Sequence, residues 1–276
     1  MALPAPSSRH TVVVTGASSG IGEQLARRLA ARGHGLTLVA RRLERLEVLA
    51  DELRVDCGVE VEVAAADLTD PDERAALAER LRTGPRILAG LCNNAGFGSY
   101  GHFHELPAAR EHEMVELNVV ALHELTAAAI RAMLPHAEGA ILNLASIAAF
   151  QPLPGMATYA ATKAFVQSFS EAVHAELAGT GISVTALSPG PSPTEFGDRA
   201  GVGIFPRVAV TPTTVSPEAI AEAGVRGMER GRRTVIPGAL PRASAFGGRL
   251  VPRTLLLPAA RIATRVGRRP PEPPPR

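Results

Sequence analysis

The chain has 276 residues, of which 46% are hydrophobic and 20% are charged, proportions typical of a soluble globular protein large enough to bury a full core. It holds no run of about 18 uninterrupted apolar residues, so we predict no transmembrane helix, and the apolar run near the N-terminus is too short for a signal-peptide core. The two cysteines, Cys57 and Cys92, lie in unrelated segments. They predict neither a disulfide framework nor a zinc site, and they favour a cytoplasmic location.

Charge is distributed unevenly along the chain. Residues 1–225 hold 17 basic and 25 acidic side chains, whereas residues 226–276 hold 12 arginines against two glutamates, a net charge of +10. Of the 29 basic residues, 28 are arginine and one, Lys163, is lysine. A general bias toward arginine would explain the 28 arginines but not the single lysine.

Short β-branched or apolar runs alternate with longer amphipathic stretches along the chain. We predict strands at Thr11–Thr15, Gly35–Ala40, Val59–Ala65, Ile87–Cys92, Ala140–Ala145, Ile182–Leu187 and Thr234–Ile236. We predict helices near 21–32, 42–56, 71–82, 108–135, 156–179 and 217–230. This alternation indicates βαβ units, and therefore a doubly wound (Rossmann) α/β fold with a parallel sheet of about seven strands and helices on both faces. One catalytic domain is expected over residues 1–240, followed by a basic Pro/Arg-rich tail over 241–276 whose end, 270–276, is expected to be disordered.

The first predicted strand runs directly into a glycine-rich turn, and a helix follows. The turn contains Gly16, Ser18, Ser19, Gly20, Ile21 and Gly22. Glycines let the backbone turn sharply and approach a pyrophosphate, whose charge is then met by the helix N-terminus. Because this turn stands at the first strand–helix junction, it favours a dinucleotide phosphate loop over an ordinary glycine-rich connection.

A dinucleotide site usually offers a carboxylate to the adenosine ribose about twenty residues after the phosphate loop. Here the second strand ends in Val39-Ala40-Arg41-Arg42, which contains no carboxylate. A guanidinium at this place can bind a 2′-phosphate through paired charge-assisted hydrogen bonds. The sequence therefore favours NADP over NAD. The alternative is that these arginines, Arg42 above all, only flank a solvated helix start.

Tyr159 and Lys163 are four residues apart in a predicted helix, so their side chains face the same way. A free tyrosine has a pKa of about 10, poorly matched to proton transfer near neutrality. A nearby ammonium favours the phenolate and lowers that pKa. The Tyr-x-x-x-Lys spacing is common by chance, but here it contains the only lysine of the chain. We therefore expect a proton-transfer pair in which the pKa of Tyr159 is lowered.

Over roughly residues 10–240 the chain resembles the short-chain dehydrogenase/reductase family, in its short single-domain branch. Thr15–Gly22 match the TGxxxGIG loop, and Asn93-Asn94-Ala95-Gly96 match the NNAG motif. Asp67, followed by Leu68, resembles the acid that contacts adenine. The other matches are Asn118 in a helix, Ser146 thirteen residues before Tyr159, and Pro189, Gly190 and Thr194 in the loop that closes on the nicotinamide. The pattern around 94–100 and 159–170 resembles ketoacyl and hydroxysteroid reductases.

This resemblance implies an NAD(P)-dependent oxidoreductase that moves a hydride between NADP(H) and a carbonyl or alcohol substrate. Tyr159 would donate or accept the proton, and Ser146 would hydrogen-bond the same substrate oxygen. Lys163 would bind the nicotinamide ribose, and Asn118 would support a water that replaces the proton. The implied cofactor contacts are Gly16, Ser18, Ser19, Gly20, Ile21, Gly22, Arg41, Arg42, Asp67, Leu68, Asn94, Ala95, Gly96, Tyr159, Lys163, Pro189, Gly190 and Thr194.

Other functions fit the sequence less well. The eight histidines, including His102 and His104, have no acidic or cysteine cluster at ligand spacing, so no metal site is expected. Nucleic-acid binding by the arginines is not expected, because only Phe246 is interleaved with them. A non-enzymatic NADP-binding sensor would have lost the catalytic set, and a sugar-nucleotide epimerase usually has TGxxGxxG spacing and a larger C-terminal domain.

Substrate and partners follow from apolar segments. Pocket candidates are Phe97, Phe150, Gln151, Pro152, Phe196 and Phe205, which favour a lipophilic carbonyl or alcohol substrate. A homodimer or homotetramer is expected through the helices at 108–135 and 156–179.

From Gly247 to Arg269 leucines and arginines mix without an acid, and Pro252 and Pro258 divide this stretch into short amphipathic pieces. It suits an anionic membrane surface or an acidic acyl carrier. Alternatively, the leucines pack over the cleft or a neighbouring subunit.

Overall fold

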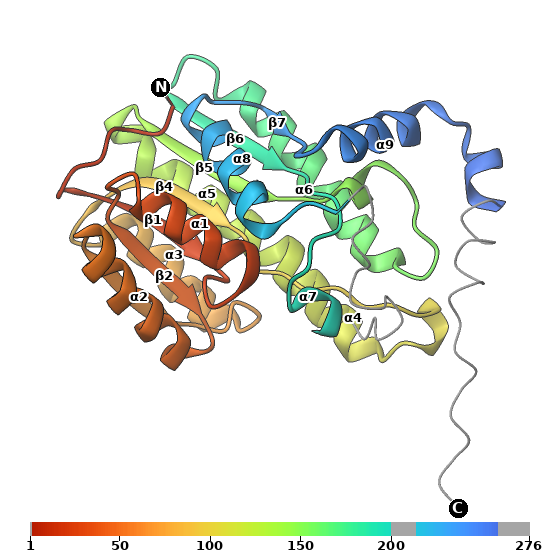
Figure 1. The fold of residues 1–276 in the computed structure, drawn as a ribbon, viewed down its shortest axis with the longest axis horizontal. Coiled ribbons are helices and arrows are strands. Elements are labelled where there is room, and N and C mark those ends of the chain that lie inside the picture. Colours follow the sequence, from red (N-terminus) through yellow and green to blue (C-terminus); the bar gives the residue numbers. More distant parts are fainter. Residues whose placement is uncertain (1, 200–213, 259–276) are drawn as a thin grey trace, which may run out of the picture.

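The computed structural model describes residues 2–199 and 214–258, which form a seven-stranded sheet covered by helices (Figure 1). The strand order is β3-β2-β1-β4-β5-β6-β7, and every neighbouring pair is parallel. The strands are β1 (His10–Thr15), β2 (Leu36–Ala40), β3 (Val61–Ala65), β4 (Ile87–Asn93), β5 (Gly139–Leu144), β6 (Ile182–Leu187) and β7 (Thr234–Val235). Each falls on a predicted strand, so the predicted doubly wound sheet is confirmed.

Helices cover both faces of the sheet and enclose two hydrophobic cores. On one face lie α1 (Gly20–Ala30), α2 (Leu43–Cys57) and α8 (Pro217–Glu229), and on the other lie α3 (Pro71–Thr83), α5 (Leu122–Met133) and α6 (Ala157–Glu176). Successive strand residues point to opposite faces, so Val12 and Val14 enter the first core while Val13 enters the second. Both cores need apolar strand residues, which explains the nearly continuous apolar runs in the sequence.

Capping residues set several helix ends where the sequence predicts them. The Asp70 carboxylate accepts hydrogen bonds from the backbone N–H groups of Asp72 and Glu73, and the Ser216 hydroxyl accepts one from the N–H of Ala219. A proline follows each cap at the first helical position, where its missing N–H costs nothing. These local signals explain why the predicted and observed starts of α3 and α8 coincide.

The long helix expected over 108–135 is interrupted in the structure. It consists of α4 (Ala108–Val115), a π-helical turn η2 (Glu116–Ala121), α5 and a 3₁₀ turn η3 (Leu134–His136). By length and composition alone this stretch could cross a membrane. However, Leu125, Ala129 and Met133 are buried in the second core, so it is a core helix of this domain.

The expected domain boundary at residue 240 falls within the first turn of α9 (Ala239–Leu250). Pro241 and Ala245 of this helix are buried, and α9 lies against the 3₁₀ turn η4 (Ile147–Phe150), so the first part of the expected tail rests on the domain. Helical backbone resumes at 253–258 after Pro252 and projects from the body (Figure 1). Pro252 thus separates two helical pieces, whereas the helix continues to Pro258, and the rest of the predicted stretch lies outside the described residues. The predicted disorder of 270–276 lies outside the described residues.

The loops after β1 and β4 meet where the strand order reverses, the place at which open α/β sheets bind ligands. Thr15 Oγ1 accepts hydrogen bonds from the backbone N–H groups of Asn94 and Ala95, both at 3.0 Å. Asn94 Nδ2 in turn donates to the carbonyl of Thr15 at 3.0 Å. Gly16 fits against this junction only because it lacks a Cβ, which would lie 2.8 Å from Asn94 Nδ2 and 2.9 Å from Ala95 Cα.

Gly16 and Gly58 allow a matched test of this packing, since both have φ of +65° but a Cβ on Gly58 would meet nothing within 4 Å. Gly58→Ala should cost about 1 kcal/mol in the free energy of unfolding through backbone strain alone. Gly16→Ala should cost about 2 kcal/mol more, because the added methyl overpacks the junction. Urea unfolding of both variants measures the difference. Equal losses of stability in the two variants would mean that the junction around Gly16 accommodates the added methyl group without cost.

Candidate active site

A pocket of about 530 Å³ opens at the carboxyl ends of the central strands, a volume typical of small-molecule sites. Thirteen of the predicted cofactor residues line it: Gly16, Ser18, Ser19, Gly20, Ile21, Arg41, Arg42, Asp67, Leu68, Asn94, Ala95, Gly96 and Thr194. Gly22 lies beneath the loop, where a Cβ would come within 2.3 Å of the Gly16 carbonyl oxygen. Pro189 and Gly190 are not among the lining residues; the Pro189 carbonyl accepts a hydrogen bond from the N–H of Ile147.

The phosphate end of the pocket is the start of α1. Ser19 is the N-cap residue of α1 and makes no side-chain capping hydrogen bond, while Gly20 and Ile21 of the first turn line the pocket. Backbone N–H groups at a helix N-terminus, together with the helix dipole, favour an anion. The glycines below leave room for a diphosphate to approach the backbone. The residues present therefore fit the phosphates of a dinucleotide.

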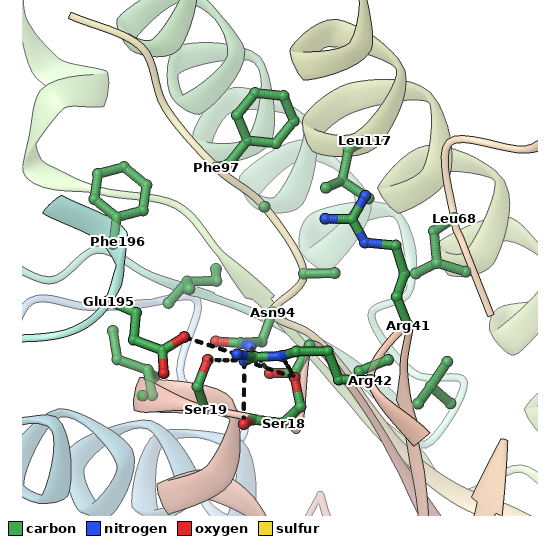
Figure 2. A pocket seen from close by; sticks show the side chains of 18 of the residues that line it. Ser18, Ser19, Arg41, Arg42, Leu68, Asn94, Phe97, Leu117, Glu195 and Phe196 are labelled. Atoms are coloured by element: carbon green, nitrogen blue, oxygen red, sulfur yellow. Dashed lines mark hydrogen bonds and ion pairs between the residues drawn. The ribbon is translucent and has the colours of Figure 1, made fainter. Parts of the chain in front are cut away.

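Arg41 and Arg42 diverge from the end of β2 (Figure 2). The side chain of Arg41 is 59% exposed, and its Nη1 lies 3.4 Å from Asp67 Oδ2. Burial opposes ionisation of Asp67, but hydrogen bonds from the hydroxyl and N–H of Thr69, together with Arg41, hold its pKa below the usual value. Arg41 thus presents a guanidinium at the solvent side of the pocket, beside the residue expected at the adenine.

Arg42 is instead held by protein groups. Its guanidinium donates to the hydroxyls of Ser18 at 3.1 Å and Ser19 at 2.9 Å, and to Glu195 at 3.0 Å (Figure 2). Arg45 also donates to Glu195, at 2.6 Å. The hydrogen bond from Arg45, against the effect of burial and aided by Arg42, lowers the pKa of Glu195 to about 2. Arg42 therefore ties the phosphate loop to the segment after β6.

The catalytic candidates gather beside the other end of the pocket. Lys163 is only 4% exposed, and its Nζ donates to the carbonyl of Leu144, a lining residue, at 2.8 Å. The ring centroid of Tyr159 lies 5.8 Å from Lys163 Nζ and 5.3 Å from the ring of Phe196, another lining residue. The Ser146 hydroxyl lies near enough to the Tyr159 phenol to affect its ionisation. Residues from β5, η4 and α6 thus converge on one point.

Burial dominates the titration of this group. It raises the pKa of Tyr159 to about 12, although the nearby Ser146 hydroxyl acts in the opposite direction. Burial also lowers the pKa of Lys163 to about 8. The expectation that the pKa of Tyr159 is lowered is therefore wrong for the protein without its cofactor. The ammonium is bonded to the Leu144 carbonyl rather than to the phenol, so its field does not offset desolvation of the ring.

Asn118 occupies the π-helical turn η2 and is 1% exposed. Its Oδ1 accepts a hydrogen bond from the N–H of Phe97 at 3.1 Å, and its Nδ2 donates to the carbonyl of Phe97 at 2.9 Å. The same Nδ2 donates to Thr162 Oγ1 at 3.2 Å. Asn118 therefore joins the loop after β4 to α6, and π turns of this kind are frequent at functional sites.

One contact at the pocket escapes sequence reasoning. The lining residue Glu195 forms an ion pair with Arg45, although 150 positions separate them in the chain. An ion pair between distant segments has no local sequence signal. Of the expected substrate residues, Phe97 and Phe196 line the pocket, Phe150, Gln151 and Pro152 are half-buried, and Phe205 lies outside the described residues.

Comparison with known proteins identifies the family. The short chain dehydrogenase family matches residues 10–201. A sulfoacetaldehyde reductase from Chromohalobacter salexigens is 39% identical over 219 residues, covering 76% of this chain and 85% of that protein.

Among solved structures, a short-chain dehydrogenase from Sphingobium yanoikuyae in complex with NADPH superposes with a TM-score of 0.78 at 39% identity, covering 90% of this chain and 95% of the other. A bulky-bulky ketone specific alcohol dehydrogenase from Comamonas testosteroni gives 0.73 at 33% identity, with 94% of each chain covered. The chain therefore belongs to the short-chain dehydrogenase family and is an oxidoreductase that transfers a hydride between a nicotinamide cofactor and a carbonyl or alcohol substrate.

Proposed function

We propose that the protein is an NADP(H)-dependent reductase of bulky, lipophilic carbonyl compounds in which Tyr159 is the general acid. The observation that carries this proposal is the placement of Tyr159 next to a buried Lys163, with Ser146 nearby, at the end of a pocket whose other end suits phosphates. A bound NADPH supplies the hydride. The chain's own residues bind the cofactor, orient the carbonyl and move the proton.

Each catalytic side chain has a distinct task in this mechanism. Ser146 donates a hydrogen bond to the substrate oxygen and stabilises the charge that develops on it. Tyr159 donates its proton to that oxygen, and its raised pKa keeps the phenol protonated at neutral pH. Lys163 holds the nicotinamide ribose and supplies positive charge behind the phenol. The amide of Asn118 is already bonded to Phe97 and Thr162, so in this mechanism a water that renews the proton would be supported by the backbone of the π turn rather than by the Asn118 side chain.

Tyr159→Phe should lower kcat by at least about a hundredfold, because only the proton donor is lost. Cofactor affinity, measured by NADPH fluorescence, should change little. Tyr100→Phe is the matched control, since the chain has only two tyrosines, and it should keep its activity. Turnover by Tyr159→Phe at the rate of the control would contradict the mechanism.

Arg41 is the proposed partner of the 2′-phosphate of NADP. Its guanidinium lines the pocket and is 59% exposed; among the described residues, Asp67 lies 3.4 Å and Glu113 3.8 Å from its Nη1. Arg42, in contrast, is already bonded to Ser18, Ser19 and Glu195. A guanidinium that keeps open positions can bind a phosphate with paired hydrogen bonds. The NADPH held by the Sphingobium yanoikuyae dehydrogenase supports the same preference.

Arg41→Asp should reverse the cofactor preference, because the new carboxylate repels a 2′-phosphate and accepts a hydrogen bond from a free 2′-hydroxyl. The measurement is the ratio of kcat/KM for NADPH to that for NADH. Arg82→Asp makes the same charge change on the similarly exposed surface of α3 and should leave the ratio unaltered. A wild-type preference for NADH would refute the role of Arg41.

The substrate proposal rests on the aromatic side chains at the catalytic end. Phe97 and Phe196 line the pocket, and a Cβ on Gly98 would lie 2.8 Å from Phe196 and 3.3 Å from the Tyr159 ring. The name of the Comamonas testosteroni neighbour supports a bulky ketone. The name of the Chromohalobacter salexigens relative points to a small sulfonated aldehyde. NADPH oxidation with steroid ketones, aryl ketones, 3-oxoacyl thioesters and sulfoacetaldehyde decides between them.

We also propose that the protein is a homodimer or homotetramer joined through α5 and α6. Phe165 is 38% exposed on α6 and stacks on Phe169 with 5.5 Å between ring centroids, while His123 of α5 lies 5.3 Å from Phe169. An exposed aromatic cluster of this kind is typical of an interface. Sedimentation at micromolar concentration should show a dimer or larger species for the wild type and a monomer for Phe165→Glu. A monomeric wild type would contradict the proposal.

The free thiols of Cys57 and Cys92 support a cytoplasmic location, which we propose for this protein.

We further propose that the protein makes peripheral contact with anionic membranes through residues 246–258. Phe246, Val251, Leu255 and Leu257 are exposed there, and residues 230–271 contain no acidic side chain. Full-length protein should co-sediment with anionic vesicles at low salt, and Leu255→Glu/Leu257→Glu should not. Wild-type protein that stays in the supernatant refutes the contact.

A further inference from the structure

A row of hydrogen-bonded polar side chains links α6 to β7 and to the segment after β6. The Ser188 hydroxyl donates to Gln167 Oε1 at 2.6 Å, and Gln167 Nε2 donates to Thr234 Oγ1 at 3.1 Å. Thr234 then donates to Glu171 Oε1 at 2.8 Å. The Glu171 carboxylate can only accept and Thr234 has a single hydroxyl proton, so Thr234 accepts from Gln167 and the Gln167 amide has its Oε1 toward Ser188.

The row is buried at its centre. Gln167 is 4% exposed and Ser188 is fully buried. A leucine at position 167 would fill such a place without the cost of desolvating an amide. A fully satisfied buried polar network contributes instead a single defined geometry. The question is therefore which geometry this network defines.

Gln167 follows Lys163 by one turn of α6, so the two side chains face the same edge of the sheet. Lys163 holds the carbonyl of Leu144 at the end of β5, and Gln167 holds Ser188 just after the end of β6. Ser188 directly precedes Pro189, whose carbonyl accepts a hydrogen bond from the N–H of Ile147, next to Ser146. The Gln167–Ser188 contact thus links α6 to the start of the segment expected to close on the nicotinamide.

We propose that Gln167 is a positioning residue for hydride transfer: through Ser188 and Thr234 it holds α6, and with it Tyr159 and Lys163, in register with the segment that begins at Pro189. This inference rests on the proposed roles of Tyr159 and Lys163. Gln167 touches neither substrate nor cofactor in this proposal. Its effect reaches the reaction through the relative placement of the proton donor and the nicotinamide end of the site.

Gln167→Met removes the amide while keeping an unbranched side chain of similar length. Displacement of reacting groups by a fraction of an ångström should lower kcat at least about tenfold, with the KM for NADPH changed by less than about threefold. The Kd for NADPH should also be nearly unchanged, because its phosphates bind at the far end of the pocket. An unaltered kcat, or a loss confined to the Kd for NADPH, would overturn the proposal.

Thr37→Val is the matched control for stability. It breaks the buried hydrogen bond between Thr37 and Thr11, 3.0 Å long, which lies toward the amino ends of β1 and β2. The control should lower the urea midpoint of unfolding while leaving kcat within about twofold of the wild type. If Thr37→Val loses as much kcat as Gln167→Met at equal loss of stability, Gln167 has only a structural role.

Gln167→Glu provides a readout that a structural role would not move. When protonated, its carboxyl group can accept a hydrogen bond from Ser188 and donate one to Thr234, as the amide does. When ionised, it still accepts from Ser188 but can no longer donate to Thr234. The charged groups around it are Lys163 and Glu171 on α6 and Arg233 beside β7. The ratio of the kcat of Gln167→Glu to that of the wild type should therefore rise as the pH falls.

Circular dichroism over the same pH range confirms that both proteins remain folded. A ratio that stays constant while both are folded would overturn the proposal. Failure of this series is distinguishable from failure of the proposed function, because the latter is decided by Tyr159→Phe in a chain with an intact Gln167.

Discussion

Burial of one ammonium group organises the catalytic end of this protein. Lys163 is almost fully enclosed, and removing its charge from water is costly unless partners compensate. The carbonyl of Leu144 is one partner, and this bond fixes α6 against the end of β5. Tyr159, one turn earlier, is thereby held over the pocket beside Ser146. The same burial lowers the pKa of Lys163 to about 8.

The opposite end of the pocket is organised by a different constraint, the close approach of two loops. Thr15 and Asn94 bind each other's backbone, and Gly16 leaves no space to spare between them. Arg42 extends this junction to Glu195 on the far side of the pocket, whereas Arg41 stays at its open side. Two parts of the chain contact both ends. One is the segment from Ser188 to Glu195, and the other is the loop after β4, in which Asn94 bonds Thr15 and Phe97 bonds Asn118.

Much of this could be predicted from the sequence because the determining signals are local. Strand and helix periodicity, caps such as Asp70 and Ser216, and the motifs around Gly16 and Tyr159 each act within a few residues. The signals that failed depend on tertiary context. The Asn118 side chain in the π turn bonds Phe97 and Thr162 of other segments, and the ion pair of Arg45 with Glu195 likewise joins distant parts of the chain. The predicted lowering of the Tyr159 pKa is wrong, because the spacing of Tyr159 and Lys163 shows that an ammonium is near the phenol but not which group that ammonium donates to.

The most direct test of the account is the ionisation of Tyr159 itself. The chain has two tyrosines and no tryptophan, so Tyr100→Phe leaves a single phenol whose ultraviolet absorbance can be titrated without interference. In the free protein, burial should keep the phenolate from forming below about pH 10, the usual tyrosine pKa. With NADP⁺ bound, the positive nicotinamide and Lys163 should move the titration to lower pH. The same titration with and without NADP⁺ would contradict the account.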